Sequence, residues 1–254
     1  MDARDQPREQ ERVRDLMDLV PHEIDRALDV GARDGYLSLQ LTRKAKFVTA
    51  VDLTAPQFDI PRVALVAGDA RSLPFADGSF DLVLCAEVLE HIPQPGMQQA
   101  CRELIRVARK YVLVGVPFEQ DTRVGRTTCG HCNARNPPYG HVNTFGQKQL
   151  AQLFSGLHAR RWSFVGRSRE RTTSVSAWLN DFAGNPWGTY DQDESCIVCG
   201  LHLSRPGQRN ITQRMASKAA FLIDRARSPF VRERPMWVHV LFEKSLGQHG
   251  LLRP

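Results

Sequence analysis

Apolar positions follow two different rhythms along the first half of the chain. Short, nearly continuous apolar runs predict buried strands, and between them apolar residues recur at i, i+3 and i+4, which predicts helices. In the stretch PGMQQACRELIRVAR this spacing places Met97, Cys101 and Leu104 on one helix face. Strands are predicted at 26–30, 47–51, 62–67, 80–85 and 111–116, and helices at about 8–19, after Gly35 and over 95–109. Strands that alternate with helices predict a parallel sheet covered on both faces.

The second half of the chain is less regular. Residues 117–145 are rich in polar residues, glycine and proline, and are too long for a simple connection, which predicts a functional or metal-tied insertion. A helix at 146–155 and strands at 159–166 and 196–203 would complete the sheet. Residues 205–254 read as a basic C-terminal extension, with a helix at about 211–226 and the apolar stretch MWVHVLF. We therefore expect one domain over 1–204 and the extension over 205–254.

Polar groups follow the predicted strands at the places where a ligand binds in this kind of sheet. Ligands bind at the carboxyl ends of parallel strands, and here those ends carry the loop Gly31–Gly35 and the carboxylates Asp52, Asp69 and Glu87. Glycines let a ligand approach the backbone closely. Several carboxylates would repel a polyphosphate, and the loop GARDG is not GxGxxG. The pattern favours a ligand with an adenosine and a cationic centre. As alternatives, the glycines only turn the chain, and the acids cap turns or a helix N-terminus.

The successive motifs resemble those of class I S-adenosylmethionine-dependent methyltransferases. The resemblance runs from about residue 25 to 117 through LDVGARDG, AVD, GDARSLPFADGSFDLVLCAEVLEHIP and RELIRVARKYVLVGVP. It implies a Rossmann-like, doubly wound, mostly parallel α/β sheet of seven strands with an antiparallel edge strand. Arg33 replaces the small residue that is usual in the first loop. The cofactor-binding residues implied by the resemblance are Asp29, Gly31 and Gly35 for the amino-acid end, Asp52 for the ribose, Asp69 and Ala70 for the adenine edge, and Glu87 beside the methionine portion or the substrate mouth.

Composition and charge set limits on the class of protein. The chain of 254 residues is 42% apolar and 24% charged, which is typical of a soluble globular protein, and no apolar run reaches the roughly 20 residues needed to span a bilayer. The charged N-terminus is unlike a signal peptide, so we expect a cytoplasmic protein. The formal net charge is +6, and over 205–234 only Asp224 and Glu233 offset the arginines and lysines. Nucleic-acid binding stays open but is not favoured, since a solvated basic surface explains the same charge.

Four of the six cysteines form two CxxC pairs, Cys129/Cys132 and Cys196/Cys199. In a reducing compartment this pairing favours a metal over disulfides. Four thiolates complete a tetrahedral zinc site without an open position, so the zinc would be structural and would clasp the insertion to the sheet edge. In one bacterial subset of the methyltransferases that this chain resembles, a CxxC is followed by a GHxxxF stretch, which here is Gly140–Phe145. Free thiols and a redox pair are the alternatives.

Methyl transfer to an alcohol needs a base of near-neutral pKa, which histidine supplies. His91, just beyond the fourth strand, and His141, in the insertion, are the candidates, each with a purely structural alternative. We expect O-methylation of a hydroxyl on a small molecule or glycan. One alternative is an RNA or protein methyltransferase docked by the basic extension. Another is a non-catalytic methyltransferase-like partner subunit, whose C-terminal extension would be a docking surface. The same extension could form the contact of an oligomer.

Overall fold

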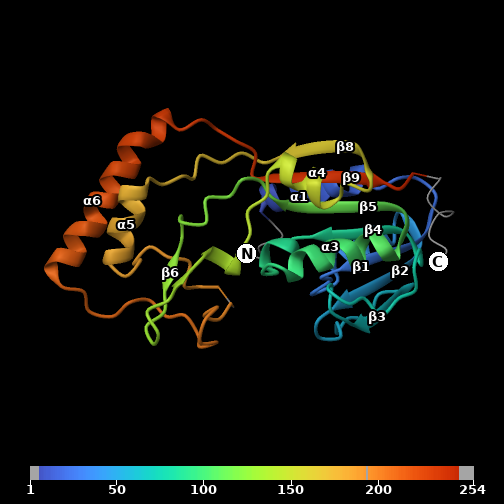
Figure 1. The fold of residues 1–254 in the computed structure, drawn as a ribbon, viewed down its shortest axis with the longest axis horizontal. Helices are drawn as coiled ribbons and strands as arrows, with labels where there is room; N and C mark the ends of the chain where they lie inside the picture. The colour runs from blue at the N-terminus through green and yellow to red at the C-terminus, as the bar shows by residue number, and fades with distance from the viewer. Residues whose placement is uncertain (1–5, 193, 246–254) are drawn as a thin grey trace. The chain divides into compact units, whose positions relative to one another are not determined.

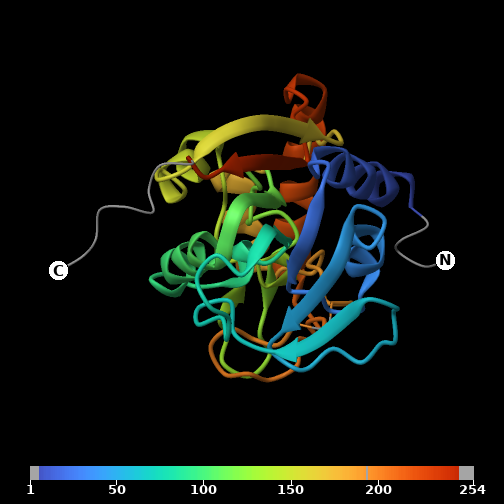
Figure 2. The same cartoon turned by 90° about the vertical axis from the view of Figure 1, so that its right-hand side faces the viewer.

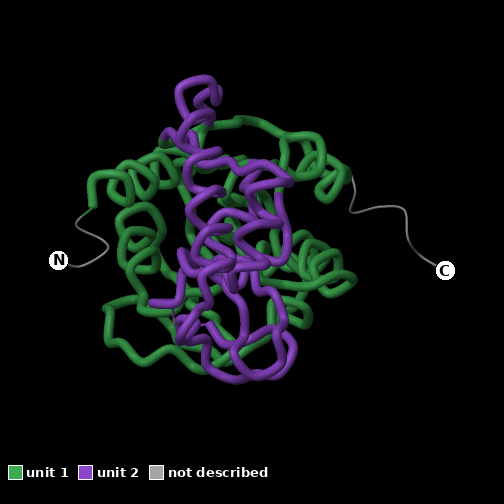
Figure 3. The backbone as a smooth tube through the Cα atoms, turned by 90° about the vertical axis from the view of Figure 1, so that its left-hand side faces the viewer, with its two compact units in different colours: residues 1–118, 145–166, 235–254 green, residues 119–144, 167–234 purple. Residues whose placement is uncertain are grey.

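The computed structural model describes residues 6–192 and 194–245, and these divide into two compact units. Unit 1 comprises residues 1–118, 145–166 and 235–254, and unit 2 comprises residues 119–144 and 167–234. Figure 3 colours the two units separately.

Unit 1 is built on a seven-stranded sheet (Figures 1 and 2) in the order β3-β2-β1-β4-β5-β9-β8. Only β9 runs against its neighbours β5 and β8, and the pairs from β3 to β5 are all parallel. The expected fold class is therefore confirmed, except that the antiparallel strand lies one position in from the edge. The strands are β1 (Ile24–Val30), β2 (Ala45–Asp52), β3 (Val63–Ala67), β4 (Phe80–Ala86), β5 (Ala108–Pro117), β8 (His158–Val165) and β9 (Trp237–Glu243).

The two faces of this sheet pack against different helices. Successive side chains of a strand point to opposite faces, so in β4 Leu82 and Leu84 join one core while Val83 and Cys85 join the other. The first core includes Leu16 and Leu41 from helices on that side, and the second includes Leu104 from the other side. The helices are α1 (Pro7–Leu19), α2 (Tyr36–Leu41), α3 (Gly96–Val107) and α4 (Gln147–Leu153), with a 3₁₀ turn η2 at Leu89–His91. The prediction that β4 and β5 are buried on both sides is confirmed.

One expectation about the second half of the chain was wrong. Residues 196–203 are not a strand of the sheet; they belong to unit 2, where Ser195 and His202 form an isolated bridge. The missing strand is β9, from the MWVHVLF stretch, whose Val238, Val240 and Phe242 enter the α3–α4 core. The chain leaves unit 1 at residue 167 and returns to it at 235.

The described residues of unit 2 form two helices, a two-stranded ribbon and a small cysteine-rich core. Helix α5 (Ser174–Phe182) begins at the N-cap Thr173, and α6 (Ile211–Arg227) begins at Asn210, whose side chain forms a capping box with Gln213. The ribbon pairs β6 (Thr127–Thr128) with β7 (Arg135–Asn136), and 3₁₀ turns lie at Pro138–Gly140 (η3) and Ser228–Phe230 (η4). In the part of the chain that the structure describes, no helix combines the length and the apolar character that crossing a bilayer requires.

Candidate functional site

The loop between β1 and α2 has a conformation that requires both of its glycines. Gly31 and Gly35 each have φ of +79°, where a side chain is strained. A Cβ on Gly31 would also lie 2.3 Å from Val88 Cγ2, and one on Gly35 would lie 2.7 Å from the Phe58 ring. The amide of Gly31 donates to the Val51 carbonyl at 2.8 Å, which ties the loop to the end of β2. Val88 and Phe58, two apolar side chains that the sequence pattern did not single out, therefore occupy the space where a side chain at either glycine would lie.

Asp29 supports this loop from below. It is the next-to-last residue of β1, is 1% exposed, and accepts a hydrogen bond of 2.6 Å from Ser38 Oγ in α2. Burial raises the pKa of its carboxyl to about 6, although the Ser38 hydrogen bond acts in the opposite direction. The carboxyl thus links the strand before the loop to the helix after it.

Asp52, the last residue of β2, holds the loop from the side. One carboxylate oxygen accepts the backbone N–H of Arg33 at 2.8 Å, and the other accepts the N–H of Leu53 at 2.7 Å. Arg33 itself is exposed and has φ of +46°. Its departure from a small residue is therefore accommodated at an exposed position, where the amide of Arg33 still bonds to Asp52.

Asp69 and Ala70 follow β3 beside Asp52. The Gly68 amide donates to the Asp52 carbonyl at 2.8 Å, so the two strand ends are in register. Arg71 pairs with the Asp69 carboxylate at 2.5 Å, and this hydrogen-bonded partner lowers the pKa of Asp69. Ala70 is 8% exposed and packs into the core. The turn thus carries a charged carboxylate next to an apolar wall.

Glu87, directly after β4, has a strained backbone and a buried carboxyl group. Its φ is +57°, and its amide donates to the Gly115 carbonyl of β5 at 2.9 Å. Trp237 Nε1 donates to Oε2 at 3.2 Å, while Oε1 is buried and has no hydrogen-bond partner among the described residues. Burial raises the pKa of Glu87 to about 7, although the charge of Arg12 and the Trp237 bond both lower it. Such a strained residue with a perturbed pKa is typical of a functional site.

Sequence reasoning missed the residues that surround Glu87. Arg12 comes from α1, is 7% exposed, and its guanidinium carbon lies 5.9 Å from the centre of the Trp237 ring. Glu90 in η2 is fully buried, and neither of its carboxylate oxygens has a partner among the described residues. Burial and the neighbouring Glu87 raise the pKa of Glu90 well above its usual value. No sequence motif identifies Arg12 or Trp237 as neighbours of Glu87. They lie far from it in the chain, and the packing of α1 and β9 brings them to it. Glu90 lies within the motif GDARSLPFADGSFDLVLCAEVLEHIP. Only its burial in the structure, and not its place in the motif, distinguishes it.

The two candidate histidines lie in different units. His91 ends η2 in unit 1 and is exposed. His141 follows η3 in unit 2, is 8% exposed, and its ring centre lies 5.8 Å from that of Tyr139. Its Nδ1 is 2.6 Å from Gln120 Oε1. Since an amide oxygen only accepts, Nδ1 carries the proton in this arrangement and Nε2 carries the lone pair of the neutral ring.

The four cysteines of the two CxxC pairs come together within unit 2. One sulfur atom from each of Cys129, Cys132, Cys196 and Cys199 lies within 4.8 Å of the others. The Sγ atoms of Cys129 and Cys199 are 3.6 Å apart, as are those of Cys132 and Cys196. Zinc–sulfur bonds of about 2.3 Å in a tetrahedron place the sulfurs about 3.8 Å apart, so the donors present fit a four-thiolate zinc site. The expectation that this clasp reaches the sheet edge was wrong, since both pairs lie in unit 2.

The two cysteine turns have the same backbone geometry. The amide of Cys129 donates to Ala134 O, and Asn133 N donates back to Cys129 O; the amide of Cys196 donates to Leu201 O, and Gly200 N donates back to Cys196 O. The fourth residue after the first cysteine has positive φ in both turns, 58° in Asn133 and 71° in Gly200. Amides of His131 and Cys132 point at the Cys129 sulfur and lower its pKa. Hydrogen bonds around metal ligands hold them in place, so this repeated turn suits a metal site built from two separate chain segments.

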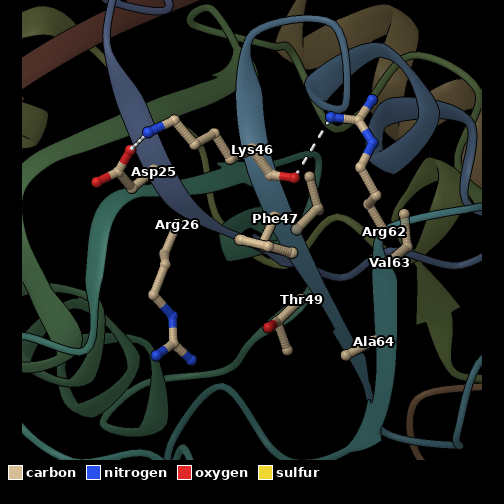
Figure 4. A pocket seen from close by; sticks show the side chains of 9 residues that line it. Asp25, Arg26, Lys46, Phe47, Thr49, Arg62, Val63 and Ala64 are labelled. Atoms are coloured by element: carbon tan, nitrogen blue, oxygen red, sulfur yellow. Dashed lines mark hydrogen bonds and ion pairs between the residues drawn. The ribbon is translucent and has the colours of Figure 1, made fainter.

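A further hollow in unit 1 lies away from these strand ends. It measures about 720 Å³ and is lined by the N-terminal halves of β1, β2 and β3, including Asp25, Lys46 and Phe47 (Figure 4). Lys46 Nζ pairs with Asp25 at 2.7 Å there, and Phe47 is 61% exposed. The hollow is an uncovered part of the sheet face and contains none of the loop residues described above.

Comparison with known proteins identifies a methyltransferase domain in this chain. Residues 28–113 match a family model described as a methyltransferase domain. The chain is 32% identical over 228 residues to the biotin biosynthesis bifunctional protein BioHC of Cellvibrio japonicus, covering 84% of this chain and 41% of that protein. It is 30% identical over 100 residues to the ubiquinone biosynthesis O-methyltransferase of Paracidovorax citrulli, covering 35% of this chain and 42% of that protein. The match therefore spans about two fifths of the length of these relatives.

Solved structures share the fold at low sequence identity. The N-methyltransferase NodS of Bradyrhizobium japonicum, in complex with S-adenosyl-L-homocysteine, aligns with a TM-score of 0.53 and 14% identity. The alignment covers 94% of this chain and 89% of NodS. At this level of identity the likeness establishes the fold alone.

Proposed function

The chain carries a class I methyltransferase domain, which residues 28–113 match, and on this premise we propose that the protein is an S-adenosylmethionine-dependent methyltransferase that methylates a hydroxyl of a small molecule or glycan. The observation that carries the proposal is the loop Gly31–Gly35, held by Asp29 and Asp52 at the ends of two neighbouring strands. The ubiquinone biosynthesis relatives are named as O-methyltransferases, which supports an oxygen acceptor.

The residues at the strand ends suit an adenosyl cofactor with a positive centre. In the proposed arrangement the backbone of Gly31 and Gly35, above Asp29, receives the amino-acid end of the cofactor. Asp52 accepts hydrogen bonds from the ribose hydroxyls. The bound cofactor supplies an electrophilic methyl group on a sulfonium. Two amides already occupy one lone pair on each Asp52 oxygen, and each oxygen has a second for a hydroxyl.

The remaining strand ends would hold the other parts of the cofactor. Asp69 and Ala70 are proposed to recognise the adenine edge through a carboxylate and a flat apolar wall. Glu87 is proposed to lie beside the methionine portion, where its ionised form would attract the sulfonium. Because the pKa of Glu87 is about 7, it is partly ionised near neutral pH in the described structure. A bound cation would favour the ionised form further.

Removal of the acceptor proton is assigned to His141, with His91 as the second candidate. The Gln120 contact supports His141, since it leaves the basic lone pair on Nε2 of the neutral ring. A well-placed base of this kind accelerates proton transfer by about 10²–10⁴-fold. The zinc proposed for the four cysteines plays no part in this step. Its role is to hold the two cysteine turns of unit 2 together.

Calorimetry on the full chain tests the proposal at its first step. S-adenosylhomocysteine should bind at one per chain, while ATP and NAD should not, because phosphates would face the carboxylates of the strand ends. A screen with radiolabelled methyl donor against small hydroxylated molecules, glycans and RNA then identifies the acceptor class. Absence of any cofactor binding would reject the enzymatic proposal in favour of a non-catalytic subunit. Labelling of RNA alone would reject the small-molecule or glycan acceptor.

A further inference from the structure

Helix α6 in unit 2 has one face that is packed and one that is not. Its buried positions are small residues, Ala216, Ser217 and Ala220, which allow a close approach to α5. The opposite face carries large apolar side chains that are more than half exposed: Ile211 at 75%, Met215 at 66% and Leu222 at 54%. These positions recur at spacings of four and seven residues, so they form one stripe along the helix. A stripe of large exposed apolar side chains marks an interaction surface.

Basic side chains line this apolar stripe on the same side of the helix. Arg214, Lys218 and Arg225 are exposed and fall at spacings of four and seven from each other, beside Ile211 and Leu222. None of the three forms an ion pair with any residue that the structure describes. The outward face of α6 is therefore both apolar and uniformly positive.

The single acid of α6 lies on its inner side. Asp224 is half-buried and accepts a hydrogen bond from Thr172 Oγ1 at 2.9 Å. It therefore does not neutralise the outward stripe. The whole chain is also positive, with a formal net charge of +6. An anionic partner is thus attracted both at long range and at the surface of α6.

A hollow of about 600 Å³ opens along the first turns of this face, next to Trp187. Ile211, Met215 and Phe221 line it, together with Arg214 and Lys218. The ring of Trp187 is 68% exposed. Apolar walls with cations at the rim would accept an acyl chain that carries a negatively charged headgroup. They would equally accept an apolar side chain that lies next to a negatively charged group.

Helix α5 contributes a second exposed stripe to the same unit. Val175, Trp178 and Phe182 lie at i, i+3 and i+7, and each is at least half exposed. The rings of Trp178 and Phe182 are stacked with their centres 6.2 Å apart. The two helices are packed side by side (Figure 1). Each of the two helices in this pair therefore exposes large apolar side chains.

We propose that the outward face of α6, with Trp187, docks this protein on an anionic lipid membrane surface. The mixture of aliphatic side chains, tryptophan and unpaired cations without a carboxylate is typical of helices that lie in the membrane interface. Nucleic acids are recognised by ring stacking and cations, whereas three of the apolar residues here, Ile211, Met215 and Leu222, are aliphatic. A dimer of like-charged faces would bring the same cations together. The proposal goes beyond methyl transfer and does not depend on it.

Vesicle flotation with the full chain and no cofactor or acceptor tests this surface. The protein should float with vesicles of phosphatidylcholine containing 30% phosphatidylglycerol and not with phosphatidylcholine alone, and 0.5 M NaCl should release it. Each cation near an anionic surface changes binding by about fivefold, so Arg214→Gln/Lys218→Gln/Arg225→Gln should weaken partitioning by about 100-fold. Met215→Ser/Leu222→Ser should weaken it at least 10-fold, because it removes apolar contacts.

A charge-matched control separates this surface from the net charge. Arg43→Gln/Lys44→Gln/Arg102→Gln removes three exposed cations from unit 1 and should change partitioning less than threefold. Circular dichroism checks that each variant is folded. The proposal is overturned if wild-type protein does not bind the anionic vesicles, or if the control loses binding as the α6 variant does. If vesicles are not bound, two other results would identify a different partner. One is binding of an RNA oligonucleotide through Arg214 and Lys218, and the other is a dimer that the Met215→Ser/Leu222→Ser variant disrupts. Since no methyl transfer is measured, these outcomes are independent of the proposed enzyme activity.

Discussion

Replacing Cys132 by serine should remove the proposed zinc from unit 2. Cys132 is half-buried, unlike Cys129 and Cys196, so the substitution removes one sulfur donor with little loss of core packing. Serine is nearly the same size, but its hydroxyl does not ionise near neutral pH and is a poor ligand for zinc.

The size of the effect follows from the structure of the cluster. Four thiolates bind structural zinc with an apparent free energy of about 10–16 kcal/mol, so one ligand carries roughly 3 kcal/mol or more, which corresponds to at least ~10²-fold in affinity. Among the described residues, the apolar core around the cluster has four buried members, Cys129, Tyr190, Cys196 and Leu203. Two of these four are themselves proposed ligands. Without the metal, little else would hold the two cysteine turns together.

Two measurements on purified protein check this prediction. Elemental analysis should find about one zinc per wild-type chain and well under one for Cys132→Ser after dialysis against a weak chelator. Hydrogen exchange should lose protection at the amides that close the two turns, those of Cys129, Asn133, Cys196 and Gly200. Cys101→Ala is the matched control, because Cys101 is buried in the unit 1 core and should leave zinc content unchanged.

Either of two results would refute the proposed zinc site. Wild-type protein purified without chelators that holds no zinc would show that the cysteines are free thiols. A Cys132→Ser protein that keeps one zinc per chain with wild-type affinity would show that the metal is bound elsewhere.

Three further variants test the cofactor and acceptor residues. Asp52→Ala should weaken S-adenosylhomocysteine binding about 10²-fold by calorimetry, because two charge-assisted hydrogen bonds to the ribose are lost; unchanged affinity would remove Asp52 from the site. His141→Ala should lower kcat about 10²-fold or more with cofactor affinity unchanged, while exposed His158→Ala should have no effect on kcat; equal turnover in both variants contradicts a base at position 141. Glu87→Gln tests a buried carboxyl whose pKa is raised from 4.5 to about 7. Between these pH values the unfolded chain has released a proton that the folded chain retains, so wild-type stability falls as pH rises through this window. The variant should gain up to about 3 kcal/mol in the free energy of unfolding at pH 8 and nothing at pH 4, measured by urea denaturation. A gain that does not depend on pH, or an equal one from exposed Glu11→Gln, would refute the assignment.

The first half of the fold was predicted well because its signals are local. A strand, a glycine loop and a helix are specified by neighbouring residues, and Gly31 and Gly35 take the positive φ that the loop requires. The carboxyl ends of parallel strands meet at one edge, so Asp52 and Asp69 could be placed close together from sequence order alone. Phe58 and Val88, which pack over the glycines, gave no signal, since an apolar residue in an irregular stretch has many uses.

The second half was predicted less well because its pairings are distant in the chain. The apolar stretches at 196–203 and at 236–242 look alike as strands, but only the second pairs with β5, more than 100 residues earlier. In the first stretch Ile197, Val198 and Leu201 are all exposed, because the cysteine turn sets the backbone there. An apolar run therefore predicted a strand where the cysteine spacing governs the structure.

The sequence by itself determined the alternation of strands and helices, the glycine loop, the order of the carboxylates and the two cysteine pairs, because each depends on residues close together in the chain. Only the tertiary structure decided that β9 completes the sheet, that all four cysteines belong to unit 2, and that α6 leaves an apolar, positive face uncovered. It also decided that Arg12 and Trp237 shape the surroundings of Glu87. These facts depend on which distant segments pack against one another. The hydrophobic effect is non-directional, so an apolar stretch does not by itself specify which other segment will bury it.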